Sequence, residues 1–208
     1  MGGKIIGLTG TCCAGKNYVA GFLEKRGIPV LDVDKLGHQA IAGEKEAIVA
    51  RFGGGILGPG GEVDRRRLGA RVFGKPEDLA ALEAIVHPEA NRLTLRWLEV
   101  QGDRPCVINA ALLHKSSVFA LLNAVILVKA PLLTRLLRAK KRDKLPWPAI
   151  IRRFRSQRDF FSRYDKKLGG IADIHVIDNR GRPVFASRPL TNALERRIDE
   201  ILAIEGIR

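Results

Sequence analysis

The sequence has few cysteines, no long apolar run and no internal repeats. Its three cysteines, two of them adjacent at Cys12 and Cys13, form no disulfide framework. No apolar stretch is long enough to span a bilayer, so we expect no membrane partner. No apolar signal region follows the first four residues, and we therefore expect a reduced cytoplasm as the location. Without low-complexity tracts or a free linker, the 208 residues are predicted to form one globular domain with insertions.

Acidic residues are scarce relative to basic ones. The chain has 22 Asp and Glu against 36 Lys and Arg, giving a formal net charge of +14. Such an excess favours a polyanionic partner, either a nucleic acid or a phosphorylated small molecule. The basic residues cluster between Arg135 and Lys167, which argues against a general solubility surface.

A phosphate-binding loop is predicted at residues 10–17, which read GTCCAGKN after the apolar run 4–9. Gly10, Gly15 and Lys16 have the required spacing, and a strand precedes the loop while a helix follows it. Backbone N–H groups and the helix dipole would hold phosphates, with Lys16 reaching the outer ones. Asn17 stands where a Ser or Thr hydroxyl normally binds magnesium. Its amide oxygen is also a hard ligand, and we predict that it binds Mg²⁺ directly or through water.

Two carboxylates close the second predicted strand, residues 30–34. Alternation along the strand would put Asp32 and Asp34 on one side. Ligands of open parallel sheets bind beyond the carboxyl ends of the strands, so both should face the phosphates. Our interpretation is a general base together with a group that orients a metal or Lys16. The alternative is that Asp34 only caps a helix over 35–42.

Residues 44–101 have a mostly helical pattern with little strand propensity, typical of an insertion. Asp64 is predicted to cap a short basic helix that contains Arg66 and could meet an anionic substrate. Pro88 should kink or restart a later helix. The preceding His87 is either a ligand of substrate phosphate or ribose, or a packing group.

Further buried strands are predicted at 105–110 and 124–128, with a last one at 173–177. Leu112 and His114 follow the first of these and so lie near the crevice. For His114, a site role and a surface-loop role remain open. A closing amphipathic helix is expected over 189–204.

Two basic helices joined by a proline-rich turn at 146–148 resemble a lid that closes over nucleotide phosphates. The first opens at Pro131, and the second contains four arginines, namely Arg152, Arg153, Arg155 and Arg158. The alternative is a solvated face or an RNA-binding hairpin, because aromatic residues interleave the basic ones: Trp147, Phe154, Phe160 and Phe161.

Taken together, these motifs resemble those of the dephospho-coenzyme A kinase family over nearly the whole length of the chain. The matching segments are 6–10 running into Gly15 and Lys16, then 32–34, 66–68 with 72–73, 87–88, and 172–181. The resemblance implies an α/β fold: a P-loop kinase core with a parallel sheet flanked by helices, a helical substrate-binding insertion and a helical lid. The core would comprise residues 1–43, 103–134 and 173–208, the coenzyme A-binding domain 44–102, and the lid 135–172.

The resemblance also implies an activity, the ATP-dependent phosphorylation of the ribose 3′-hydroxyl of dephospho-coenzyme A, with Mg²⁺ as cofactor. Asp34 matches the base, and Arg138 and Arg142 match lid positions that clamp the transferring phosphoryl group together with Lys16. ATP would be bound by the loop and by an adenine-side turn: Gly10, Cys13, Ala14, Gly15, Lys16, Asn17, Tyr18 and Asn179. The acceptor would be bound by Asp32, Asp34, Arg66, His87 and Leu112. Gln157 matches a lid-helix glutamine.

The chain departs from the family pattern at Asn17, at Ala111 and His114, where the family has Pro and Glu, and in a longer stretch over 157–172. The alternatives are another P-loop kinase with a different acceptor, and a non-enzymatic RNA-binding protein, with nucleic acid the less favoured partner. We expect a monomer or a weak homo-oligomer.

Since a helix N-terminus lowers thiol pKa, we also expect that alkylation of Cys12 and Cys13 blocks ATP binding.

Overall fold

The computed structural model describes residues 3–155, 157, 160, 164, 173–180 and 191–207. Its contacts divide the chain into two compact units. The first unit comprises Met1–Leu31 and Gln101–Arg208, and the second comprises Asp32–Val100. None of the described helices is long and apolar enough to cross a membrane. The predicted positions Arg158, Phe161, Lys167, Ala172, Gly181 and Pro189 lie outside the described residues.

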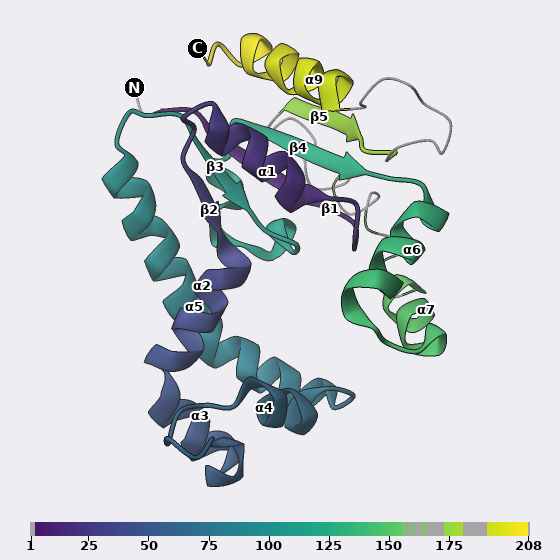
Figure 1. Cartoon of the computed structure of the whole chain (residues 1–208). Helices are drawn as coiled ribbons and strands as arrows, with labels where there is room; N and C mark the ends of the chain where they lie inside the picture. Colours follow the sequence, from purple (N-terminus) through teal and green to yellow (C-terminus); the bar gives the residue numbers. More distant parts are fainter. Residues whose placement is uncertain are drawn as a thin grey trace. The chain divides into compact units, whose positions relative to one another are not determined.

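A five-stranded sheet in the order β2-β3-β1-β4-β5 organises the first unit (Figure 1). Its strands are β1 (Ile5–Gly10), β2 (Val30–Asp32), β3 (Cys106–Asn109), β4 (Ala124–Lys129) and β5 (Asp173–Asp178). The central strand β1 pairs in parallel with β3 and β4, and β4 pairs in parallel with β5. Because β1, β3 and β4 are almost fully buried, they read as continuous apolar runs rather than alternating ones. The predicted α/β class is confirmed.

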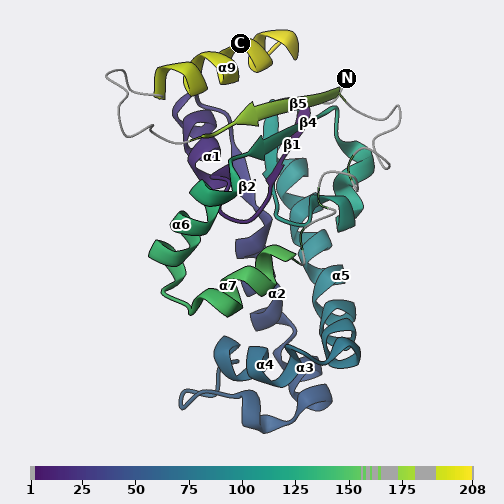
Figure 2. The ribbon, with the colours of Figure 1, turned by 90° about the vertical axis from the view of Figure 1, so that its right-hand side faces the viewer.

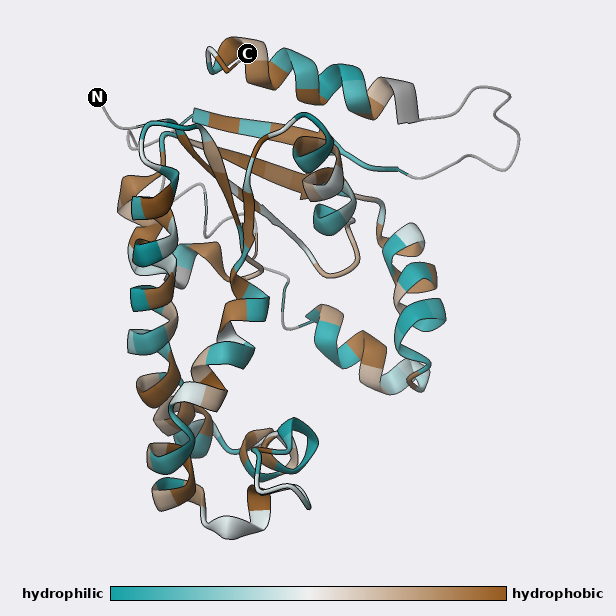
Figure 3. Ribbon diagram, turned by 60° about the vertical axis from the view of Figure 1, so that its left-hand side comes forward, coloured by the Kyte–Doolittle hydropathy of each residue, from teal (hydrophilic) through white to brown (hydrophobic). Residues whose placement is uncertain are grey.

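Two helices, α1 (Lys16–Lys25) and α9 (Thr191–Ile204), build the main core with the sheet. Val19, Phe22 and Leu23 of α1 and Ile198 and Ile201 of α9 join the buried residues of the strands. In Figures 1 and 2, α9 runs alongside β5. Figure 3 shows mostly hydrophobic central strands, a mixed edge strand β5, and helices that alternate hydrophobic with hydrophilic residues, as expected for helices that cover a sheet with one face.

The two basic helices are α6 (Leu132–Asp143) and α7 (Trp147–Arg155), which pack on each other. Their shared apolar cluster is small, with Ala139, Ile150 and Phe154 buried. Lys144, in the left-handed conformation at φ 54°, ends α6 before Pro146. Short 3₁₀ turns at Gly54–Ile56, Leu113–Lys115 and Ser117–Leu121 complete the loops.

The second unit is helical, with α2 (Val33–Gly43), α3 (Lys45–Phe52), α4 (Arg65–Val72) and most of α5 (Pro76–Gln101). It has its own core, centred on Ile48, Phe52, Ile56 and Leu68. Asp64 caps α4 by accepting hydrogen bonds from the backbone N–H groups of Arg66 and Arg67 at 2.8 and 3.1 Å, as predicted. The boundaries proposed above for three functional domains stay a prediction.

Two local expectations were wrong. Residues 30–34 do not form one strand: β2 ends at Asp32, whose Oδ1 accepts from the backbone N–H groups of Asp34 and Lys35 and begins α2. Asp32, not Asp34, is therefore the cap, because only a residue before the first turn can reach those N–H groups. The helix does not restart at Pro88, since α5 runs from Pro76 to Gln101 with Val86 and Ala90 buried in the unit's core on either side of the proline; a kink there stays a prediction.

Candidate functional site

The loop between β1 and α1 needs glycine at both ends. A Cβ on Gly10 would lie 2.6 Å from the Val128 carbonyl oxygen, and one on Gly15 would lie 2.2 Å from Asn179 Nδ2. Gly15 also has φ 99°, a conformation that L-residues rarely adopt. The loop carbonyl of Thr11 accepts from the Ala14 N–H at 3.0 Å, which closes a tight turn. The sequence thus folds into the compact glycine-framed turn that phosphate binding requires.

Lys16 is held by a polar side chain at the end of β3. Its Nζ donates to Asn109 Oδ1 at 3.0 Å, and Asn109 Nδ2 donates to Asn17 Oδ1 at 3.2 Å. Asn109 is buried, with 2% of its surface exposed, so its amide has a fixed environment. Sequence reasoning missed it as a site residue. The available signal was a polar residue at the carboxyl end of a buried parallel strand, the edge where ligands bind.

Arg138 and Asn179 form one wall of the loop. Arg138 Nη1 donates to the carbonyls of Cys13 and Ala14 at 3.3 and 3.2 Å, and its Nη2 donates to the Asn179 carbonyl at 3.3 Å. Asn179 Nδ2 donates to the Ala14 carbonyl at 2.8 Å. The structure therefore brings together the loop, α6 and the end of β5 without any ligand.

The other arginines of the predicted lid differ in environment. Arg135 Nε donates to the Cys12 carbonyl at 2.9 Å and its guanidinium lies 4.8 Å from the Phe154 ring centroid; burial lowers its pKa. Arg142 is instead exposed and donates to Asp143 at 2.7 and 3.2 Å. Those hydrogen bonds raise the pKa of Arg142 and lower that of Asp143, which also accepts from Arg153 at 2.6 Å. Arg142 is paired with a carboxylate and can exchange it for a phosphate oxygen.

The expectation of an activated thiol was wrong for Cys13. Burial, followed by the neighbouring Cys12, raises the pKa of Cys13 to about 11. Both cysteines pack against the apolar cluster of α6 and α7, and the removal of water there outweighs the helix dipole. At neutral pH Cys13 is protonated, so its simple alkylation is slow.

His114 is not a surface-loop residue, and its site role stays a prediction. It is 6% exposed, its backbone N–H donates to the Tyr164 hydroxyl at 3.3 Å, and its ring meets the Tyr164 ring edge-on at 5.4 Å between centroids. Tyr164 is fully buried, and its hydroxyl is also 3.3 Å from Thr9 Oγ1 at the end of β1. These residues are a packed polar cluster beneath the loop. Leu112, in contrast, is 48% exposed.

Four of the residues predicted to bind the acceptor belong to the second unit, and they differ in exposure and in their contacts. They are Asp32, Asp34, Arg66 and His87. The Asp32 carboxylate caps α2, while Asp34 lies in the first turn with its side chain exposed. Arg66 lines a cavity of about 650 Å³ together with His38, Glu62, Val63, Asp64 and Arg65. Arg65 Nη1 lies 2.9 Å from His38 Nδ1 in that cavity. His38 and Arg65 were not among the predicted site residues; His87 is exposed on α5.

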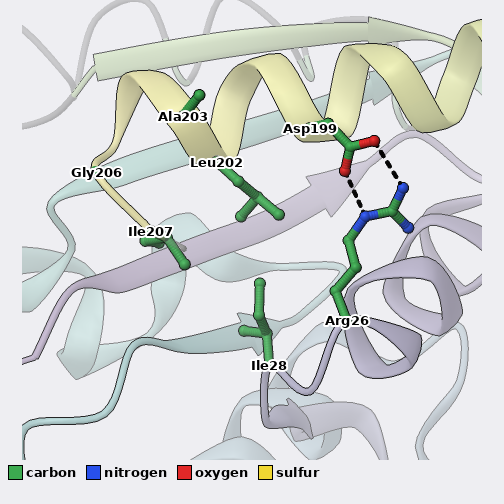
Figure 4. Close-up of a pocket in the computed structure, with 7 residues that line it drawn as sticks. All are labelled: Arg26, Ile28, Asp199, Leu202, Ala203, Gly206 and Ile207. Atoms are coloured by element: carbon green, nitrogen blue, oxygen red, sulfur yellow. Dashed lines mark hydrogen bonds and ion pairs between the residues drawn. The ribbon is translucent and has the colours of Figure 1, made fainter.

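A second cavity, of about 540 Å³, lies between the end of α1 and the C-terminal part of α9 (Figure 4). Ile28, Leu202 and Ile207 line it, and a bidentate ion pair from Arg26 to Asp199 closes one side. None of the predicted site residues lines this cavity. It is therefore separate from the candidate nucleotide site.

The oxygen ligands near the loop fit a magnesium ion that is held mainly by nucleotide phosphates. Among the described residues no group of three or more His, Cys, Asp or Glu side chains could hold a metal by itself. Mg²⁺ needs no such group, because it usually keeps waters and phosphate oxygens and takes one or two protein ligands. The exposed Asn17 amide oxygen, which accepts from Asn109 Nδ2 at 3.2 Å, has the chemistry that such a ligand needs.

Known proteins share this architecture. A family model described as dephospho-CoA kinase matches residues 4–182. A dephospho-CoA kinase of Halalkalibacterium halodurans is 35% identical over 198 residues, which cover 92% of this chain and 96% of that protein. One from Anaeromyxobacter dehalogenans is 37% identical over 207 residues, covering 96% of this chain and 91% of that protein.

Solved structures agree with the sequence relatives. A crystal structure of a Thermus thermophilus protein has a TM-score of 0.78 at 32% identity and covers 98% of both chains. A dephospho-CoA kinase from Campylobacter jejuni, at 23% identity, has a TM-score of 0.67, covers 96% of this chain and 95% of that one, and supports the fold. The chain therefore belongs to the dephospho-CoA kinase family, and it is a P-loop kinase that phosphorylates dephospho-CoA to coenzyme A.

Proposed function

We propose that the chain transfers the γ-phosphoryl group of ATP to the ribose 3′-hydroxyl of dephospho-CoA, with Lys16 and Asp34 as its central residues. The hydroxyl oxygen attacks the γ-phosphorus, the bond to the β-phosphate oxygen breaks, and ADP leaves. The hydroxyl proton passes to the Asp34 carboxylate. Because this reaction needs little covalent chemistry from the protein, positioning and charge stabilisation supply most of the rate.

The observation that carries the proposal is the hydrogen-bonded chain Lys16–Asn109–Asn17 at the phosphate loop. It holds the ammonium of Lys16 in place before ATP binds. A preorganised cation costs no reorganisation when negative charge develops on the γ-phosphoryl oxygens. Of the backbone N–H groups of residues 13–18, those of Ala14 and Tyr18 donate to the carbonyls of Thr11 and Gly15 at 3.0 Å, so the other four are assigned to the phosphates. Asn179 is assigned to the adenine side.

The lid supplies two arginines of different kinds. Arg138 is bonded to the carbonyls of Cys13 and Ala14, so it is assigned to holding the loop's shape as well as to the phosphates. Arg142 is exposed and bonded to Asp143, so it is assigned to the transferring phosphoryl group after it exchanges partners. Such an exchange fits a lid that closes on its substrate.

The choice of Asp34 over Asp32 as base rests on their local contacts. Oδ1 of Asp32 accepts two backbone N–H groups at 3.1 and 3.4 Å, contacts that commit this carboxylate to capping α2. The Asp34 side chain is exposed on the first turn of α2. Arg66, His87 and Leu112 are assigned to the acceptor. Mg²⁺, held by ATP and Asn17, would neutralise phosphate charge.

The experiment is a coupled ADP-release assay with dephospho-CoA against a panel of nucleosides and nucleotides. We expect ADP release only with dephospho-CoA, and a product whose new phosphate lies on the 3′-oxygen by phosphorus NMR. Lys16→Ala should lower turnover by orders of magnitude, with Lys25→Ala, at the other end of α1, as the matched control. Turnover of a different panel member would instead identify another P-loop kinase, and phosphate at another oxygen would refute the 3′ assignment.

A further inference from the structure

Two thiols lie next to each other inside the phosphate loop. Cys12 Sγ and Cys13 Sγ are 3.7 Å apart, and both residues are half-buried. Both pack against the apolar cluster of α6 and α7, which includes Phe154 and Ile150. The pair therefore lies where the loop meets the lid, and neither thiol has a part in phosphoryl transfer.

We propose that Cys12 and Cys13 form a redox-active dithiol, which a small-molecule disulfide oxidises to an intramolecular disulfide that prevents ATP from binding. In the first step a cysteine thiolate attacks the reagent RSSR, forms a mixed disulfide and releases one RS⁻. The neighbouring thiolate then attacks the protein sulfur of that mixed disulfide and releases the second RS⁻. Overall, two protein thiols are oxidised, RSSR is reduced to two RSH, and the protons balance.

A disulfide between adjacent residues must change the loop. Their Cα atoms are about 3.8 Å apart across a trans peptide, whereas disulfides usually join Cα atoms roughly 4.4–6.8 Å apart. The sulfurs must also approach from 3.7 Å to about 2.05 Å. Cys13 already has φ 59°, a conformation with little room for adjustment in a residue with a Cβ.

The backbone around the pair is held from three sides. The Cys12 N–H donates to Gln157 Oε1 at 2.8 Å, and the Cys12 carbonyl accepts from Arg135 at 2.9 Å. The Cys13 carbonyl accepts from Arg138 at 3.3 Å. Closing the disulfide rotates this backbone, so it disturbs the contacts of the lid and the N–H groups assigned to phosphate. The same strain makes the disulfide easy to reduce, and oxidation is reversible.

The thiol chemistry favours an internal disulfide over a stable adduct. The pKa of Cys13 near 11 makes an initial attack by this thiol slow at neutral pH and faster as pH rises. Once one thiol carries a mixed disulfide, its neighbour is part of the same turn and attacks at a high effective concentration. The mixed disulfide should therefore not accumulate.

The test is oxidation of the reduced full chain by oxidised glutathione, followed by mass analysis of the peptide that contains both cysteines. We expect this peptide to lose two hydrogen atoms and to carry no glutathione. ATP at about ten times its Kd should slow the loss roughly tenfold, because oxidation and ATP binding exclude each other. This arm rests on the proposed ATP site. Dithiothreitol should restore both the mass and the affinity for ATP.

Three variants sharpen the result. Cys12→Ser and Cys13→Ser should each retain one glutathione on the remaining thiol, since no neighbour displaces it. Cys106→Ser removes the buried thiol of β3 and should behave as the unmodified sequence does.

The proposal is overturned by stable adducts on the unmodified sequence, by oxidation at an unchanged rate with ATP bound, or by full ATP affinity of the disulfide form. ATP binding is measured calorimetrically without acceptor, so failure of the acceptor assignment leaves this test intact.

Discussion

At the scale of single residues, Asn109 connects the ammonium of Lys16 with the amide of Asn17. Its Oδ1 accepts from Lys16 while its Nδ2 donates to Asn17. An amide has both a donor and an acceptor on one planar group, whereas an ionised Asp would offer only acceptors. Buried at the end of β3, Asn109 can hold both partners at once with no loss of freedom on ATP binding.

Asn109→Ala should lower kcat/KM for ATP by roughly ten- to a hundredfold, because a hydrogen bond to a charged group contributes about 1.5–3 kcal/mol. The matched control is Asn123→Ala at the opposite end of the sheet, where Asn123 Oδ1 accepts from the Ile5 N–H at 2.7 Å. The control should lose about 1 kcal/mol of unfolding free energy and keep its KM for ATP. Steady-state kinetics and urea unfolding measure both. Equal kinetics in the two variants would contradict this role of Asn109.

At the scale of elements, the start of α2 separates a structural carboxylate from an exposed one. Asp32→Ala should reduce the unfolding free energy by about 1 kcal/mol, since it removes the acceptor for two N–H groups of the first turn. Asp34→Asn should still unfold cooperatively in urea and should lower kcat by orders of magnitude, because it removes the proposed base. Urea unfolding and coupled assays of both variants test the distinction. Near-normal turnover of Asp34→Asn would remove the base assignment.

Helix α6, part of the predicted lid, has two arginines whose contacts predict different defects. Arg138→Ala removes hydrogen bonds to the carbonyls of Cys13, Ala14 and Asn179, so ATP affinity and thermal stability should fall together. Arg142→Ala removes an exposed side chain paired with Asp143, so kcat should fall while ATP affinity and stability change little. Calorimetry with ATP, thermal unfolding and kcat are measured for each variant. An equal loss of thermal stability in both variants would contradict the different roles predicted for Arg138 and Arg142.

The elements that could be predicted from sequence are those whose local signals and burial agree. The apolar run before Gly10 predicted strand β1, and Asp64 predicted the start of α4; both predictions are confirmed. Pro88 did not restart its helix, because a proline signal is local while the packing of Val86 and Ala90 is tertiary. The environment of Cys13 was also out of reach, since its pKa depends on desolvation by helices more than a hundred residues later. Asn109 and Tyr164 contribute through contacts across the chain that spacing alone does not reveal.

At the scale of the whole molecule, the two compact units carry different parts of the proposed reaction. The phosphate loop, Asn179 and the lid arginines belong to the first unit, while Asp34, Arg66 and His87 belong to the second. The net charge of +14 belongs to the first unit, which has 26 Lys and Arg against 11 Asp and Glu, whereas the second unit has 10 against 11, so long-range attraction of anions does not extend equally to both units. Specificity must therefore come from the local contacts of each unit, which makes the division of labour testable by one substitution in each.

Arg66→Ala should raise the KM for dephospho-CoA about tenfold or more and leave the Kd for ATP unchanged, because Arg66 lines the cavity of the second unit. Lys16→Ala should weaken ATP binding instead. Arg92→Ala serves as the control for loss of a positive charge, since Arg92 is paired with Glu89 on α5 and is not among the residues lining that cavity. Calorimetry with ATP and kinetics with varied acceptor separate the outcomes. An equal rise in acceptor KM for Arg66→Ala and Arg92→Ala would mean that net charge alone recruits the acceptor, and the assignment of the cavity would fail.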